Sequence, residues 1–192
     1  MSCRAPLLLA ALLAACSAEP PSRADVKIVA DLGLGKFASV ARCTPGPGQA
    51  QPPCPGPSCI DNAVGTPDGK LVDLGACPTI DLVFTGGTIV AQSGPPDLRL
   101  HLGSTSGLTR VEASLDGKLY VVVGFVAAKA SDLPVGTDES CAAQIAGGAA
   151  SISLSRCNTI SKATFVRLTR DEQVLGGATL DAAEALSFAA DQ

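Results

Sequence analysis

The sequence of 192 residues is poor in the side chains that build most binding and catalytic sites. It has no tryptophan, one tyrosine and one histidine, and aromatic residues make up 3% of it. So few aromatic rings argue against a broad stacking platform, and a single histidine leaves little choice for a catalytic triad. Charged residues make up 17% and form no basic cluster, so we expect no nucleic-acid partner.

Apolar runs long enough to span a bilayer are also absent, and the longest apolar run lies at the start of the chain. A single positive charge at Arg4 precedes an apolar run over 7–13 and small residues up to Cys16. This run is far shorter than the roughly 20 residues that span a bilayer, and its layout is typical of an export signal. We expect residues 1–15 to be a cleaved signal peptide and residues 16–25 to hold a polar tether.

The last four residues of this segment, Leu-Ala-Ala-Cys over 13–16, resemble the bacterial lipobox. In the lipobox the cysteine thiol is acylated and the cysteine becomes the new N-terminus. The resemblance implies a lipid on Cys16 that attaches the protein to a membrane, and acyl chains of this kind hold a protein firmly. With Ser17 in place of aspartate, it also implies an outer-membrane or cell-surface location in a bacterial envelope. The alternative is a secreted protein in which Cys16 forms a disulfide.

Six of the eight cysteines remain once Cys3 leaves with the signal and Cys16 is acylated. An even number in an exported chain predicts disulfides, and the spacing within CPGPSC (54–59) does not match a zinc-binding CxxC. Sequence alone leaves many pairings open. We expect one late pair and a linkage of the Pro-rich loop 43–59 to the start of the folded domain by the other four. The late pair is Cys141 with Cys157, and the other four are Cys43, Cys54, Cys59 and Cys77.

From about residue 70 the sequence consists of short apolar runs separated by turn residues. This spacing predicts an antiparallel β-sandwich or barrel. The dipeptide Asp116-Gly117 predicts a β-hairpin over 109–127 with a type I′ turn. Helix is expected only as a turn or two over 138–146 and 181–186. The expected strands are 71–74, 79–84, 88–91, 98–102, 109–115, 118–127, 151–155 and 163–170.

Several segments in this order resemble the bacterial galactose-binding or discoidin-like domains, which have a jelly-roll fold. The resemblance covers residues 64–187 and implies an all-β antiparallel sandwich with very little helix, stapled here by disulfides, over 26–192. The segments are VGTPDG (64–69), LVDLG (71–75), GPPDL (94–98), VEASLDG (111–117), FVRLT (165–169) and LDAAEAL (180–186).

Jelly rolls of this type often bind a structural Ca²⁺ through loop carboxylates. The candidate ligands are Asp68, Asp97 and Asp181. The alternative for the first two is that their carboxylates accept hydrogen bonds from nearby backbone N–H groups in Asx turns.

Two further residues are candidates for ligand contact. On the expected strand 98–102 alternation places His101 opposite the leucines, toward solvent or a groove, and Tyr120 lies beside the expected turn, where its ring could stack on a ligand. The phenylalanines at 84, 125 and 165 lie in apolar runs and are expected in the core.

These observations favour a non-catalytic, lipid-anchored envelope protein with an interaction or adhesion role toward an unknown protein or glycan. A carbohydrate-binding jelly roll with structural calcium is the alternative. A second alternative is an anchored hydrolase, which depends on His101 and neighbouring hydroxyls. A pocket that joins His101 to an acid would favour the hydrolase.

Overall fold

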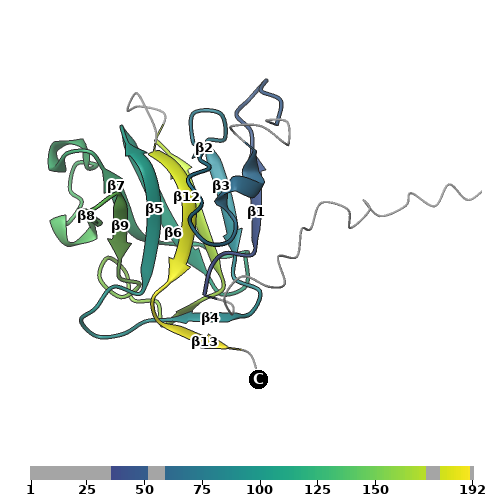
Figure 1. Ribbon diagram of the computed structural model, residues 1–192. Helices are drawn as coiled ribbons and strands as arrows, with labels where there is room; N and C mark the ends of the chain where they lie inside the picture. Colours follow the sequence, from purple (N-terminus) through teal and green to yellow (C-terminus); the bar gives the residue numbers. More distant parts are fainter. Residues whose placement is uncertain (1–35, 52–58, 172–177, 191–192) are drawn as a thin grey trace, which may run out of the picture.

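The computed structural model describes residues 36–51, 59–171 and 178–190 (Figure 1). The expected signal peptide, Cys16 with its tether, and Cys54 lie outside these ranges. In the described part, antiparallel strands and three short 3₁₀ turns account for the regular structure. No helix there is long and apolar enough to cross a bilayer. The 3₁₀ turns are η2 (Ile60–Ala63), η3 (Ala130–Asp132) and η4 (Glu139–Cys141).

Two five-stranded sheets pack face to face, and a three-stranded sheet lies across one end (Figure 1). The front sheet has the order β2 (Val72–Asp73), β12 (Ala178–Ala185), β5 (Leu98–Thr105), β9 (Ala149–Ile152) and β8 (Gln144–Ala146). The back sheet has the order β1 (Val40–Thr44), β3 (Thr79–Val83), β11 (Phe165–Arg170), β6 (Leu108–Ser114) and β7 (Val121–Ala127). The end sheet has the order β10 (Lys162–Ala163), β4 (Gly87–Val90) and β13 (Phe188–Ala190).

The core forms where the alternating apolar faces of the two large sheets meet. On β5 the leucines are buried while Arg99 and His101 point outward, and on β11 Val166 and Leu168 are buried while Arg167 points outward. Successive side chains of a strand point to opposite faces, so this pattern gives each sheet one apolar face. The expected all-β antiparallel sandwich is therefore confirmed, as is the outward position of His101.

The expectation of a helical turn over 181–186 is wrong. These residues belong largely to β12, which pairs with β5 along most of its length. The alanines that favour a helix also fit a buried strand, where small side chains let the opposite sheet approach. The expectation for 138–146 is met only by the single turn η4, and the segment ends in strand β8.

The expected β-hairpin is confirmed as the β6–β7 pair, but its turn is longer than a two-residue type I′ turn. The last paired residues are Ala113 and Val121. Gly117 has a φ of 70°, which an L side chain rarely adopts, and the carboxylate of Asp116 accepts hydrogen bonds from the N–H groups of Lys118 and Leu119. The dipeptide thus shapes the loop from within instead of closing the strands directly.

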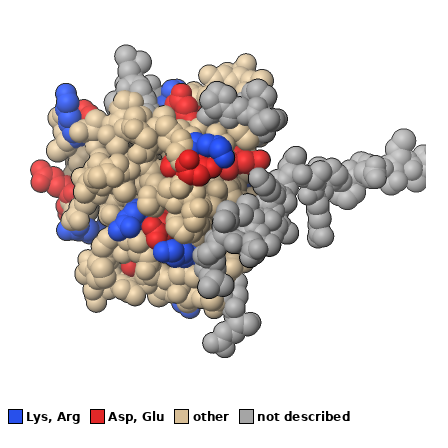
Figure 2. Space-filling view, viewed as in Figure 1, with Lys and Arg blue, Asp and Glu red and all other residues tan. Residues whose placement is uncertain are grey.

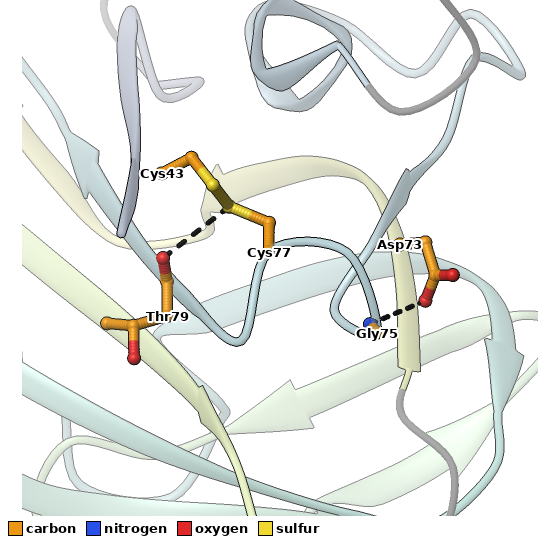
Figure 3. Close-up of a disulfide and its surroundings, with 5 residues drawn as sticks. All are labelled: Cys43, Asp73, Gly75, Cys77 and Thr79. Carbon is orange, nitrogen blue, oxygen red and sulfur yellow. Dashed lines mark hydrogen bonds between the residues drawn. A yellow bond between two sulfur atoms is a disulfide. The ribbon is translucent and has the colours of Figure 1, made fainter. Parts of the chain in front are cut away.

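Two disulfides lie wholly within the described residues. Cys43 on β1 bonds Cys77, the last residue of a tight turn that begins at Asp73. In this turn the Asp73 carboxylate accepts a hydrogen bond from the N–H of Gly75 (Figure 3). Cys141 in η4 bonds Cys157, as expected. A disulfide bond also involves Cys59. The Cys43–Cys77 bond fastens β1 to the loop before β3, and the Cys141–Cys157 bond fastens the long β7–β8 loop to the segment after β9. The expected linkage of the Pro-rich loop through Cys54 and Cys59 lies partly outside the described residues and stays a prediction.

Candidate functional site

A hollow of about 520 Å³ lies on the outer face of the back sheet. Three adjacent strands each contribute one outward side chain to it: Thr169 on β11, Arg110 on β6 and Phe125 on β7, which are direct partners across the sheet. Directly paired residues on neighbouring strands point to the same face. A hydroxyl, a guanidinium and an aromatic ring therefore form a row across the floor of the hollow.

A β-bulge shapes the apolar side of this hollow. The β6–β7 register shifts opposite Val123, so Val122 and Phe125 line the hollow together although they are three residues apart. A Cβ atom at Gly124 would lie 3.2 Å from the backbone oxygen of Cys141. Glycine thus permits close packing of η4 against β7. The expectation that Phe125 belongs to the core is wrong, because the bulge turns its half-buried ring outward.

The β7–β8 loop forms one wall. Pro134 contributes its ring to the lining, and the loop returns to β7, where the N–H of Ala143 donates a 2.8 Å hydrogen bond to the backbone oxygen of Phe125. The Cys141–Cys157 disulfide holds the same segment from the other side. This wall is therefore fixed both by backbone pairing and by a covalent link.

The far end of the hollow is polar. Arg170 and Asp171 line it, and the N–H of Asp171 donates a 2.9 Å hydrogen bond to the backbone oxygen of Leu108. Within the described part of the chain, Nε of Arg170 and Oγ1 of its cross-strand partner Thr109 are buried without a hydrogen-bond partner. Unmet hydrogen-bonding capacity is thus concentrated at this end of β6 and β11.

Apolar and polar groups share the hollow. Phe125, Val122 and Pro134 offer apolar surface, while Arg110 offers N–H donors, and its Nε lies 3.5 Å from the Glu112 carboxylate. Thr169 and Asp171 add a hydroxyl and a carboxylate. Such a lining suits a small ligand that has both an apolar face and hydroxyl groups. The sequence alone does not indicate these residues as a site, and the glycine in the apolar run of 121–127 is its one signal of a bulge.

Tyr120 lies on the same outer face, but another side chain covers its ring. The guanidinium of Arg167 lies 3.9 Å from the ring centroid, and that guanidinium also makes a two-point ion pair with Asp81 at 2.7 and 3.1 Å. Burial raises the pKa of the Tyr120 hydroxyl. The cation–π contact occupies one face of the ring, so at most the other face is left for a ligand.

His101 lies on the outer face of the front sheet. Its Nε2 is 3.1 Å from Oε2 of Glu184, whose carboxylate also meets Lys36 at 2.6 Å and Arg99 at 3.6 Å. Burial opposes the ionisation of Glu184, yet the hydrogen bonds from Lys36 and His101 and the charge of Arg99 hold its pKa below its ordinary value. On the face seen in Figure 2, acidic and basic side chains lie in small mixed groups.

This cluster meets only part of what a hydrolase needs. The acid is present, but within the described residues Glu184 is the one hydrogen-bond partner of the His101 ring. A histidine that activates a nucleophile must lie within hydrogen-bond reach of a hydroxyl or thiol. The arrangement is that of an ion-pair network that joins β5, β12 and the segment at Lys36.

Two of the three calcium candidates lie together. The carboxylate of Asp181 accepts hydrogen bonds from the N–H groups of Asp68 and Gly69, both at 3.1 Å. Asp68 accepts a hydrogen bond from the N–H of Lys70 at 2.9 Å and pairs with its ammonium at 2.7 Å. Asp68 therefore forms the Asx turn considered as the alternative to metal binding.

Asp97 lies elsewhere and is fully buried. Its two oxygens accept hydrogen bonds from the N–H groups of Gln92 at 2.8 Å and Leu154 at 2.9 Å. The β5–β12 pairing places it near Ala185, about 13 Å along β12 from Asp181 at 3.3 Å per residue. A single calcium ion cannot contact all three candidates, because Ca²⁺ binds oxygen at 2.3–2.6 Å. No group of three His, Cys, Asp or Glu side chains placed to hold a metal occurs in the described ranges.

No protein-family model matches the chain, and no curated protein matches it. Among solved structures it is similar to the C-terminal domain of a chitobiase from Bacteroides fragilis, with 16% identity and a TM-score of 0.37 over 59% of this chain and 64% of that one. The aligned part is thus less than two thirds of the chitobiase domain.

Two modules from Clostridium perfringens are also similar. One, CBM32-5, was solved in complex with GalNAc-β-1,3-galactose; it has 18% identity and a TM-score of 0.44 over 76% of this chain and 94% of that one. The other, CBM32-3 from a family 31 glycoside hydrolase, has 16% identity and a TM-score of 0.39 over 79% and 91%. These low values carry no inference about a ligand, and the β-sandwich is established by the strand pairing itself.

Proposed function

We propose that this protein is a non-catalytic, lipid-anchored module of the bacterial envelope that binds a neutral saccharide in the hollow of the back sheet. The observation that supports this most is the row of Thr169, Arg110 and Phe125. A sugar ring has an apolar C–H face and an edge of hydroxyl groups, and the row offers an aromatic ring beside hydrogen-bonding groups. This arrangement favours carbohydrate binding, which the sequence offers as an alternative, and not an unspecified adhesion role.

The size and charge of the hollow support a small neutral ligand. Its volume of about 520 Å³ lies within the roughly 300–1,000 Å³ typical of small-molecule sites. A ligand hydroxyl can both donate and accept, so it can accept from the Arg110 guanidinium and donate to the Thr169 hydroxyl. Such pairing suits a polyol.

Membrane attachment is the second part of the proposal and depends on Cys16. A lipid there attaches the protein to the envelope, so the sandwich itself is free to bind a saccharide. An outer-membrane or cell-surface location places the hollow where glycans occur. This proposal does not require calcium, because the described residues include no group of three His, Cys, Asp or Glu side chains placed to hold a metal ion.

Isothermal titration with a panel of neutral mono- and disaccharides, GalNAc-β-1,3-galactose among them, tests the saccharide site. We expect Phe125→Ala and Arg110→Gln each to weaken binding about 5- to 30-fold, since each removes roughly 1–2 kcal/mol of stacking or charge-assisted hydrogen bonding. Arg99→Gln, on the front sheet, is the matched control and should bind as the parent does. Equal affinity in all four proteins would place the site elsewhere.

A further inference from the structure

Three large apolar side chains are exposed together where β6 turns into β7. The exposed fractions are 57% for Leu115, 79% for Leu119 and 38% for Val121. These three residues are called the leucine tip below. Exposed leucines on one loop do not contribute to the core, so the folded domain gains nothing from them.

Hydrogen bonds fix the loop that carries the leucine tip. The Asp116 carboxylate accepts from the N–H groups of Lys118 at 2.9 Å and Leu119 at 3.1 Å, and Oγ of Ser114 accepts from the N–H of Gly117 at 3.0 Å. These backbone hydrogen bonds lower the pKa of Asp116, so its charge is held by the loop itself. The backbone at Leu119 is thus held in place, and its side chain is 79% exposed.

We propose that the leucine tip inserts into the surface of the bilayer to which the lipid on Cys16 attaches the protein. The proposal rests on the lipid-anchor part of the proposed function. Residues 17–35 separate the lipid from the first described residue, and nineteen residues can extend at most about 60–70 Å. A tether of that reach lets the tip turn toward the membrane, and the lipid keeps that membrane within reach at all times.

The chemistry of the tip fits a membrane better than a protein partner. Its three apolar side chains come from one loop and one strand end. The area they can bury is far smaller than the roughly 1,200–2,000 Å² that a stable protein interface buries. Lys118, exposed between the two leucines, carries a positive charge toward anionic headgroups, whereas the neighbouring carboxylate of Asp116 is already hydrogen-bonded.

Insertion of the tip has a consequence for the hollow. Phe125 lies four residues along β7 from Val121, or about 13 Å at 3.3 Å per residue. A tip in the headgroup layer thus holds the saccharide site close to the membrane surface. A tether alone leaves its height and orientation open.

A single introduced tryptophan tests the insertion, because the natural chain has none. The full mature lipoprotein is reconstituted in vesicles of phosphatidylethanolamine and phosphatidylglycerol as Leu119→Trp, with Val135→Trp as the matched control. Val135 is fully exposed on the loop that follows the opposite end of β7. We expect the emission of the L119W protein to shift to the blue and to be quenched by brominated acyl chains, and that of the V135W protein to stay unchanged.

Three results would overturn the inference. If the protein floats with the vesicles but L119W is not quenched, the anchor stands and the tip does not insert. If the protein fails to float, both the anchor and the inference fall. If L119W emission shifts to the blue without vesicles and in proportion to protein concentration, the tip contacts a second copy of the chain.

Discussion

The buried carboxylate of Asp97 allows the sharpest test of how the loops between the sheets are held. Its oxygens accept hydrogen bonds from the N–H groups of Gln92 and Leu154, and its own backbone N–H donates one to the backbone oxygen of Ile152. Asp97→Ala removes both acceptors and leaves the buried N–H of Leu154 and the partly buried N–H of Gln92 unpaired. A buried unpaired group costs about 1–3 kcal/mol and a partly buried one costs less, so we expect the free energy of unfolding to fall by about 1–4 kcal/mol. Asp97→Asn keeps one acceptor oxygen and should lose about half as much.

Urea unfolding of the oxidised protein, followed by circular dichroism, measures this loss. A domain of this size is stable by about 5–15 kcal/mol, so Asp97→Ala should remove a large part of the total. The loss should be the same in the presence of calcium and of chelator, because backbone N–H groups satisfy the carboxylate. A change below about 0.5 kcal/mol would refute the reasoning, as it would match an ordinary surface substitution. A loss seen only with calcium would make Asp97 a metal ligand.

Two other substitutions probe the ion-pair cluster and the wall of the hollow. The pKa of Glu184 is held below its ordinary value of 4.5, so its ionised form stabilises the fold above that pH and the contribution disappears as the pH falls through the lower folded-state pKa. Glu184→Gln should therefore flatten the fall of unfolding free energy below about pH 4.5, and an unchanged slope in acid urea titrations would contradict this. Removing the Cys141–Cys157 link, which closes a loop of 16 residues, by a double Ala substitution should cost about 3 kcal/mol and weaken saccharide binding by loosening the Pro134 wall. Unchanged affinity at full folding would show that the wall needs no covalent support.

Most strands of the sandwich could be predicted from period-two alternation. The run 98–102 places buried and outward side chains as the structure does, and on β11 Val166 and Leu168 are buried with Arg167 outward. Phe165, for which the sequence predicts a place in the core, is only partly buried. The segment 178–185 could not be predicted in this way, because its alanines carry no alternation between apolar and polar residues. Its strand conformation comes from pairing with β5, which is a long-range contact that local propensity does not report.

The candidate site was less predictable than the fold. The apolar run of 121–127 does not reveal which side chains face outward, and the bulge that exposes Phe125 depends on the register against β6. Arg110 and Thr169 meet only because β6 and β11 are neighbours, although 59 residues separate them in the chain. Positions outside the core for Tyr120 and His101 could be predicted from the sequence. Their side-chain partners could not, because Arg167 contacts the Tyr120 ring and Glu184 contacts His101 only through long-range packing.

The most direct test of the saccharide site is an NMR titration of the oxidised mature protein with the neutral disaccharide panel, observed at the aromatic rings. The chain has five phenylalanines, so the ring of Phe125 can be assigned by substitution. We expect a binding saccharide to shift the Phe125 ring signals together with the backbone signals of Arg110 and Thr169, while signals around His101 stay in place. Shifts centred on His101 and Glu184, with Phe125 unmoved, would contradict a saccharide site on the back sheet.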